Sequence, residues 1–135
     1  EKGYLYWSGD ISPEDNPWEA GLGMFVHLEK KDFIGRQALI KIKAQGLNSR
    51  LVTLTMDAGG ILYGGESVRK NGRVVGRIRS GNYGYSIGKD IGLVYLPTEL
   101  AIVGTDLDVE VLGDQVRARV AESALVDPAG AKLRA

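Results

Sequence analysis

Side chains that perform chemistry in enzymes are sparse in this 135-residue sequence. It contains no cysteine and one histidine, His27, which excludes disulfides, thiolate catalysis and a histidine cluster for a transition metal. Neither a nucleophile elbow nor a P-loop is present. His27 alternates with the apolar residues Val26 and Leu28, which favours a structural histidine over a catalytic base. We therefore expect no catalytic residue in this chain.

Four carboxylates lie close together in one early loop: Asp10, Glu14, Asp15 and Glu19. Oxygen ligands of this kind bind calcium, but their spacing does not match the EF-hand pattern. Turn-forming residues surround them in the stretch SGDISPEDNP. The sequence therefore predicts a solvated loop and no metal site.

Two further stretches resemble ligand-binding motifs. Residues 59–66, GGILYGGE, are glycine-rich like a phosphate loop, but they lack the lysine and the following helix. Residues 76–86 interleave Arg77 and Arg79 with Tyr83 and Tyr85, as a surface for single-stranded nucleic acid does. Because Lys+Arg and Asp+Glu balance at 17 each, no net field attracts nucleic acid or an anionic membrane. We predict turns at a barrel corner and an ordinary exposed strand face.

The elements before residue 49 read as a small α+β unit. Residues 4–7 (YLYW) and 21–28 (GLGMFVHL) have the composition and alternation of short strands. Residues 32–35 form a turn in which Asp32 can cap the following helix. The helix begins at Arg36 and stops at Gly46.

From about residue 49 the hydrophobic period changes to two, which predicts a small antiparallel β-barrel. Residues 50–56 (RLVTLTM) place Val52, Leu54 and Met56 on one face. Asn71-Gly72 is a strong hairpin signal, and the apolar run 90–97 (DIGLVYLP) predicts a strand buried on both faces.

The last hairpin can be paired residue by residue. A two-residue turn at Gly113-Asp114 has glycine in the first position, as a type II′ turn requires. It places Leu112 opposite Gln115, and it makes the further pairs Val111–Val116, Glu110–Arg117, Val109–Ala118, Asp108–Arg119 and Leu107–Val120. Such cross-strand pairs contribute about 0.2–1 kcal/mol each.

Four blocks resemble, in order, the C-terminal part of the aminomethyltransferase family, which comprises the glycine-cleavage T-protein and the folate-binding halves of dimethylglycine and sarcosine dehydrogenases. The blocks are EKGYLYWSGDISPEDNPWEAGLG, KKDFIGRQAL, GRVVGRIRSGNYGYSIGKDIGLVYLP and VDPAGAKLR. The resemblance implies three subdomains that enclose tetrahydrofolate. Residues 1–48 are then the end of the central α+β folate-binding subdomain, and residues 49–135 are the C-terminal barrel. The fold expected is mainly β, with a strand-strand-helix remnant before the barrel.

The resemblance also implies a partial binding site. Glu1 matches the glutamate that grips the pterin, and its carboxylate can accept two parallel N–H bonds. Lys30 or Lys31 occupies the place of a basic residue that meets the glutamyl carboxylate of folate, although an ordinary solvated lysine is an equal alternative. The family's catalytic aspartate lies upstream of this segment. The family's C-terminal tyrosine has no counterpart in DPAGAKLRA.

The function expected is a fragment of an enzyme that transfers a one-carbon unit from an amine donor to tetrahydrofolate, in glycine cleavage or in dimethylglycine or sarcosine oxidation. FAD in an upstream domain, the preceding subdomains as partners, and an artificial dimer of the fragment are open possibilities. The absence of an initiator methionine favours a piece of a longer protein. We expect a cytoplasmic or mitochondrial-matrix location. A stand-alone β-barrel interaction module is the alternative.

Overall fold

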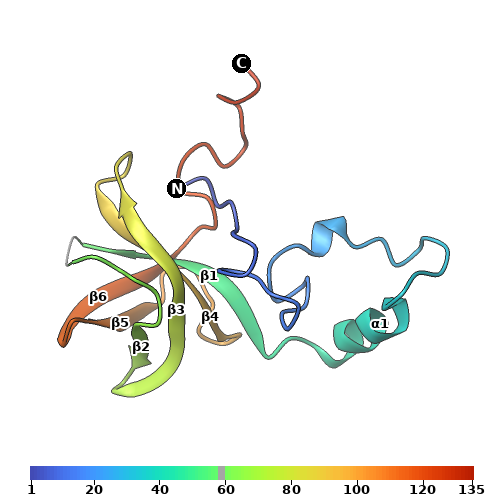
Figure 1. Cartoon of the computed structure of the whole chain (residues 1–135), viewed down its shortest axis with the longest axis horizontal. Helices are drawn as coiled ribbons and strands as arrows, with labels where there is room; N and C mark the ends of the chain where they lie inside the picture. Colours follow the sequence, from blue (N-terminus) through green and yellow to red (C-terminus); the bar gives the residue numbers. More distant parts are fainter. Residues whose placement is uncertain (58–59) are drawn as a thin grey trace.

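The computed structural model describes residues 1–57 and 60–135, and Figure 1 shows a barrel with an extended N-terminal segment on one side. Within these residues the elements before the barrel are a 3-10 helix η1 (Gly23–Phe25) and α1 (Arg36–Gln45). Six strands follow: β1 (Ser49–Met56), β2 (Ser67–Lys70), β3 (Arg73–Gly84), β4 (Lys89–Pro97), β5 (Asp106–Val111) and β6 (Asp114–Ala121). The mainly β class with one preceding helix is confirmed.

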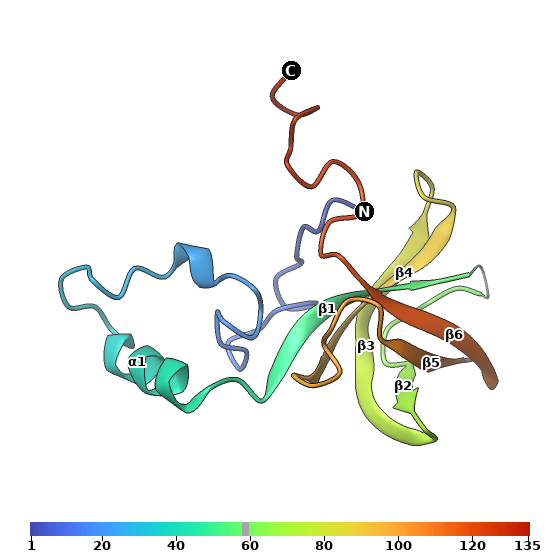
Figure 2. The ribbon, with the colours of Figure 1, turned by 180° about the vertical axis from the view of Figure 1, so that it is seen from behind.

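The barrel closes in the order β1-β4-β3-β2-β5-β6, and all neighbours are antiparallel. Closure is made by β6 returning to β1, where Thr53 opposes Ala121 and Met56 opposes Ala118. After β6 the chain passes the N-terminus and extends away from the barrel (Figure 2). The N- and C-terminal segments therefore meet outside the barrel wall.

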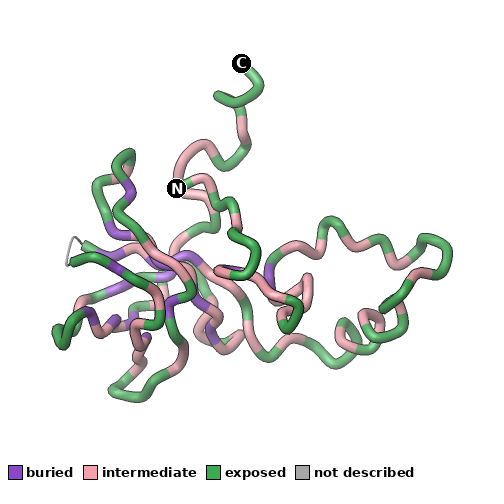
Figure 3. The backbone as a smooth tube through the Cα atoms, viewed as in Figure 1, coloured by how far each residue is buried: buried purple, intermediate pink, exposed green. Residues whose placement is uncertain are grey.

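The hydrophobic core lies inside the barrel, where Figure 3 shows most of the buried residues. Alternation along each strand places every second side chain inside. Leu54 and Met56 are fully buried and Val52 packs against the core, which confirms the face predicted for residues 50–56. Burying a side chain of this size stabilises the fold by about 1.5–3 kcal/mol.

The prediction that residues 90–97 are buried on both faces is wrong. In β4 the side chains alternate between full burial, as at Val94 and Leu96, and partial burial, as at Leu93 and Tyr95. The reason is that the inner face fills the barrel, whereas the outer face is covered only in part by the N-terminal segment.

The β2–β3 turn lies where the sequence predicted it, whereas the β5–β6 turn does not. Asn71 and Gly72 both have positive φ and connect β2 to β3, as expected. The β5–β6 turn is at Leu112-Gly113, not at Gly113-Asp114. Both residues have positive φ (51° and 95°), as a type I′ turn requires, and Val111 therefore pairs with Asp114.

The two strands expected over residues 4–7 and 21–28 do not form. Residues 4–7 contain only one isolated bridge, between Trp7 and Ile11, and residues 23–25 form η1. A strand needs a hydrogen-bonded neighbour, and among the described residues these stretches have none beyond the single Trp7–Ile11 bridge. α1 forms as expected and ends at Gly46 (φ 81°), but Gly35 occupies its N-cap in place of Asp32.

Candidate functional site

The N-terminal segment is held against β3 and the turn after it by three carboxylates. The pairs are Glu1 with Ser86, Asp10 with Ser80 and Asp15 with Arg79. The carboxylates follow one another as residues 1, 10 and 15, whereas their partners follow as residues 86, 80 and 79. The two stretches therefore run in opposite directions. This arrangement places Glu1 beside the turn that connects β3 to β4.

The carboxylate of Glu1 is bound by a single residue of that turn. One oxygen accepts the backbone N–H of Ser86 at 2.5 Å, and the other accepts the Ser86 hydroxyl at 3.0 Å. The backbone hydrogen bond from Ser86 is the main reason that the pKa of Glu1 lies below its ordinary value. The group is therefore an anion at neutral pH, and a carboxylate retains further lone pairs for a ligand.

The backbone of Glu1 is held by the C-terminal segment. Its carbonyl oxygen accepts the N–H groups of Leu125 (2.8 Å) and Val126 (3.0 Å). The next residue, Lys2, donates to the carboxylate of Asp127 at 3.0 Å, and this contact is the main reason that the pKa of Asp127 is lowered. Glu1 is thus fixed by two different parts of the chain.

The early acidic residues do not form the solvated loop that the sequence predicted. Asp10 is only 1% exposed and accepts the backbone N–H of Tyr6 at 2.7 Å and the hydroxyl of Ser80 at 2.5 Å. Glu19 accepts hydrogen bonds from the side chains of Asn16 and Ser49. Because Asp10, Asp15 and Glu19 each have a partner, they anchor the loop, whereas Glu14 is exposed and its carboxylate has no partner among the described residues. Among the residues that the structure describes, no three His, Cys, Asp or Glu side chains are grouped to hold a metal ion.

Tyr95 lies beneath the same contact area. The guanidinium of Arg79, which pairs with Asp15, sits 5.0 Å from the centre of the Tyr95 ring. The Tyr95 hydroxyl is buried and has no hydrogen-bond partner among the described residues. Burial, assisted by the negative charge of Asp15, raises the pKa of Tyr95 to about 12. Tyr95 is therefore a neutral packing group and not a nucleophile at physiological pH.

An apolar hollow of about 570 Å³ lies between the N-terminal segment and the outer face of β1 and β4. Its walls include Tyr4, Leu22, Met24, Phe25, Val52 and Leu93. A smaller hollow of about 50 Å³ has Glu1 in its lining and shares Tyr4 and Leu93 with the larger one. An apolar surface with an anion at its end is chemically suited to a flat ring that carries N–H donors.

Lys30 and Lys31 lie apart from Glu1. Both are exposed, in the loop that precedes α1, and Figures 1 and 2 show α1 at the far end of the N-terminal segment from the N-terminus. In the described part of the chain neither forms an ion pair, and their binding role stays a prediction. His27 is exposed too, so it is not the packed structural histidine that its neighbours indicated.

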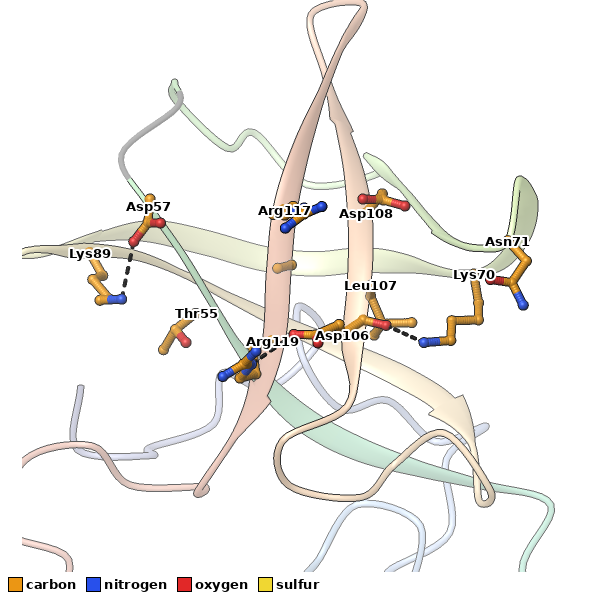
Figure 4. A pocket seen from close by; sticks show the side chains of 11 residues that line it. Thr55, Asp57, Lys70, Asn71, Lys89, Asp106, Leu107, Asp108, Arg117 and Arg119 are labelled. Carbon is orange, nitrogen blue, oxygen red and sulfur yellow. Dashed lines mark hydrogen bonds and ion pairs between the residues drawn. The ribbon is translucent and has the colours of Figure 1, made fainter.

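A third hollow, of about 530 Å³, lies on the barrel between β5, β6 and the β2–β3 turn, and its lining is mostly charged (Figure 4). Lys89 pairs with Asp57 at 3.1 Å and Arg119 with Asp106 at 2.7 Å. Lys70 donates to the backbone oxygen of Asp106 at 2.6 Å. These groups satisfy one another at an exposed surface, where solvent screening leaves each pair a weak contribution to stability. This hollow carries no functional assignment.

Sequence reasoning missed Ser86, Ser80 and Tyr95. The Glu1–Ser86 and Asp10–Ser80 pairs are separated by 85 and 70 positions. No local period or motif connects residues so far apart. The only signal was the unusual number of carboxylates in the first 20 residues.

Comparison with known proteins agrees with this architecture. Residues 49–127 match the family described as the glycine cleavage T-protein C-terminal barrel domain. A solved structure of the glycine cleavage system aminomethyltransferase T from Bartonella henselae superposes with a TM-score of 0.82 at 25% identity, covering 89% of this chain and 34% of that one.

Two curated relatives extend the similarity beyond the barrel. Mitochondrial dimethylglycine dehydrogenase from Mus musculus is 43% identical and covers 99% of this chain, which spans 16% of that protein. Aminomethyltransferase from Rippkaea orientalis is 44% identical and covers 89% of this chain, which spans 33% of that protein. The chain thus corresponds to a minor part of both relatives. It belongs to the glycine cleavage T-protein C-terminal barrel domain family.

Proposed function

We propose that this chain is the C-terminal, folate-binding part of an aminomethyltransferase-type enzyme, which passes a one-carbon unit from an amine donor to tetrahydrofolate. The observation that carries the proposal is Glu1, whose ionised carboxylate is bound by Ser86 and which lines a small hollow that shares Tyr4 and Leu93 with the apolar hollow. Similarity to dimethylglycine dehydrogenase and to aminomethyltransferase supports the same assignment.

The residues of this chain fit a pterin edge. Folate, when bound, supplies the nitrogen atoms that accept the one-carbon unit. Glu1 accepts two parallel hydrogen bonds from the 2-amino group and the N3–H of the pterin, because two charge-assisted bonds of this geometry suit a carboxylate. Lys30 or Lys31 meets the glutamyl end, which fits a ligand as elongated as folate. The groups that handle the reacting atoms belong to other parts of the longer protein.

The donor is an aminomethyl carrier, as in glycine cleavage, or an iminium from oxidation of dimethylglycine or sarcosine. Oxidation requires an electron acceptor, and FAD in a preceding domain supplies it in that version of the proposal. Both versions use the same role for Glu1. The visible absorption spectrum of the complete protein shows whether it contains a flavin, and this distinguishes the two possible donors. The proposed location is the cytoplasm, or the mitochondrial matrix in a eukaryote.

We further infer that another part of the same longer protein covers the apolar hollow. Tyr4, Met24 and Phe25 line this hollow and are each at least 72% exposed, a large apolar area for one face. The isolated chain is expected to self-associate through this face in sedimentation velocity experiments, and Phe25→Ser is expected to reduce that association. A strictly monomeric chain at high concentration would contradict the inference.

Calorimetry with tetrahydrofolate tests the proposed function. The complete product of the reading frame that contains this chain is expected to bind tetrahydrofolate, and Glu1→Ala is expected to weaken binding about 10- to 100-fold through loss of two charge-assisted hydrogen bonds. Glu14→Ala is the matched control, because Glu14 is exposed and its carboxylate has no described partner. Unchanged affinity in Glu1→Ala removes the assignment.

A stand-alone interaction module is the second candidate, and one observation favours it. The six strands close their barrel within residues 49–121, without help from another chain. If the complete gene product does not bind tetrahydrofolate, this candidate becomes the better reading.

A further inference from the structure

We propose that Ser86 is a positioning residue for the carboxylate of Glu1, so that the turn between β3 and β4 is part of the ligand site. The inference rests on the proposed function, because the orientation of Glu1 matters to a ligand only if the protein binds folate. It assigns to the barrel a direct part in building the site.

Two donors from one residue determine how the carboxylate is oriented. The Ser86 N–H binds one oxygen at 2.5 Å and the Ser86 hydroxyl binds the other at 3.0 Å. A carboxylate that has a single donor can rotate about its last bond, whereas donors to both oxygens fix its plane. The plane must be fixed before two parallel N–H groups of a ligand can meet both oxygens without an ordering cost.

The turn that carries Ser86 is itself well fixed. The carbonyl oxygen of Gly84 accepts the N–H groups of Ile87 (3.2 Å) and Gly88 (2.8 Å). Gly88 has a φ of 65°, which favours glycine, and a Cβ at the buried Gly84 would lie 2.7 Å from the Cδ1 atom of Ile91. The donors of Ser86 therefore belong to a turn that two backbone hydrogen bonds to Gly84 hold in place.

The backbone and the side chain of Glu1 are held separately. The C-terminal residues Leu125 and Val126 bind its carbonyl oxygen, and Ser86 binds its carboxylate. Loss of the Ser86 hydroxyl is therefore expected to leave the Ser86 N–H as the single donor, so that the carboxylate can rotate while the backbone of Glu1 stays in place. This separation distinguishes positioning from a merely structural role.

The first test follows Glu1 directly in this 135-residue chain, without folate. The ¹³C shift of the Glu1 carboxyl is titrated against pH in the wild type, Ser86→Ala and Ser86→Thr. The largest influence on this pKa is the backbone N–H of Ser86, and the α-ammonium of Glu1 and the N–H of Ile87 act in the same direction; none of the three is removed by these variants, so the hydroxyl accounts for part of the lowering. The pKa of Glu1 is expected to rise toward its ordinary value in Ser86→Ala and to return in Ser86→Thr. Ser123→Ala is the control, because that exposed hydroxyl makes no hydrogen bond in the described residues.

The second test measures tetrahydrofolate affinity of the complete protein by calorimetry. Ser86→Ala is expected to lower affinity about 3- to 10-fold, less than Glu1→Ala, and Ser86→Thr is expected to restore it. A Glu1 pKa that is unchanged in Ser86→Ala overturns the positioning role, whatever the protein binds. The positioning role is also overturned if Ser86→Ala shifts the pKa of Glu1 but leaves the affinity for tetrahydrofolate unchanged, while Glu1→Ala weakens binding. If Glu1→Ala leaves affinity unchanged, the proposed function fails and the role of Ser86 toward a ligand fails with it, while the contact itself stands.

Discussion

Substitution of Ser80 by alanine tests whether Asp10 is a desolvated carboxylate that depends on its donors. Asp10 is 1% exposed, so water cannot replace a lost partner. It has two donors, the Ser80 hydroxyl at 2.5 Å and the Tyr6 N–H at 2.7 Å, and Ser80→Ala removes one of them. A hydrogen bond to a charged group contributes about 1.5–3 kcal/mol, and we expect a loss of about 2 kcal/mol. For a chain of 135 residues this corresponds to a fall in Tm of roughly 7 °C.

Urea unfolding at pH 7 measures this loss as a lower midpoint with an unchanged m-value. In a double-mutant cycle with Asp10→Ala, the coupling energy is expected to be about 1.5–3 kcal/mol. Amide exchange at Tyr6 is expected to accelerate, because its N–H binds the other oxygen of the same carboxylate. Ser123→Ala is again the matched control. A change below about 0.5 kcal/mol in Ser80→Ala, or full additivity in the cycle, would refute the reasoning.

Three further predictions concern the barrel. Tyr95 is expected to ionise at a pH near 12, which absorbance at 295 nm detects in the wild type and Tyr95→Phe abolishes. Because the folded-state pKa is raised, this group stabilises the fold fully below pH 10, and the stabilisation is lost as the pH rises toward 12; a flat pH dependence of unfolding relative to Tyr95→Phe would contradict this. Leu96→Ala is expected to cost about 2–5 kcal/mol in urea unfolding, whereas Ile34→Ala, on a fully exposed side chain, is expected to stay within about 0.5 kcal/mol. Gly76→Ala is expected to cost about 1–3 kcal/mol, because the new Cβ would lie 2.7 Å from the backbone oxygen of Tyr95; an unchanged Tm would show that the strands separate easily at this point.

The barrel was largely predictable because its signals are local. Period-two alternation identified the inner face of β1, and Asn71-Gly72 identified a turn whose two residues must have positive φ. The β5–β6 turn was misplaced because moving the register by two residues leaves every side chain on the same face. Pattern alone cannot distinguish the two registers. Leucine at positive φ is also disfavoured, so Leu112 gave no turn signal.

The N-terminal segment was less predictable for a different reason. Residues 4–7 have strand composition, but strands form only where a partner supplies the other half of the hydrogen bonds. For the candidate site, resemblance singled out Glu1 among the carboxylates, and its binding role stays a prediction. Its partner Ser86 could not be found, because contacts across 85 positions follow from the closed topology and not from neighbouring residues.

Closure of the barrel also limits how this protein associates with others. Each of its six strands has a hydrogen-bonded neighbour on both sides, so none stands at the border of a sheet where a further strand can be added. A partner of this barrel is therefore expected to contact its side chains and loops and not to add a strand to it. The same property removes the usual template for amyloid-like growth from the barrel, and unwanted aggregation is expected to begin at the exposed aromatic residues outside it.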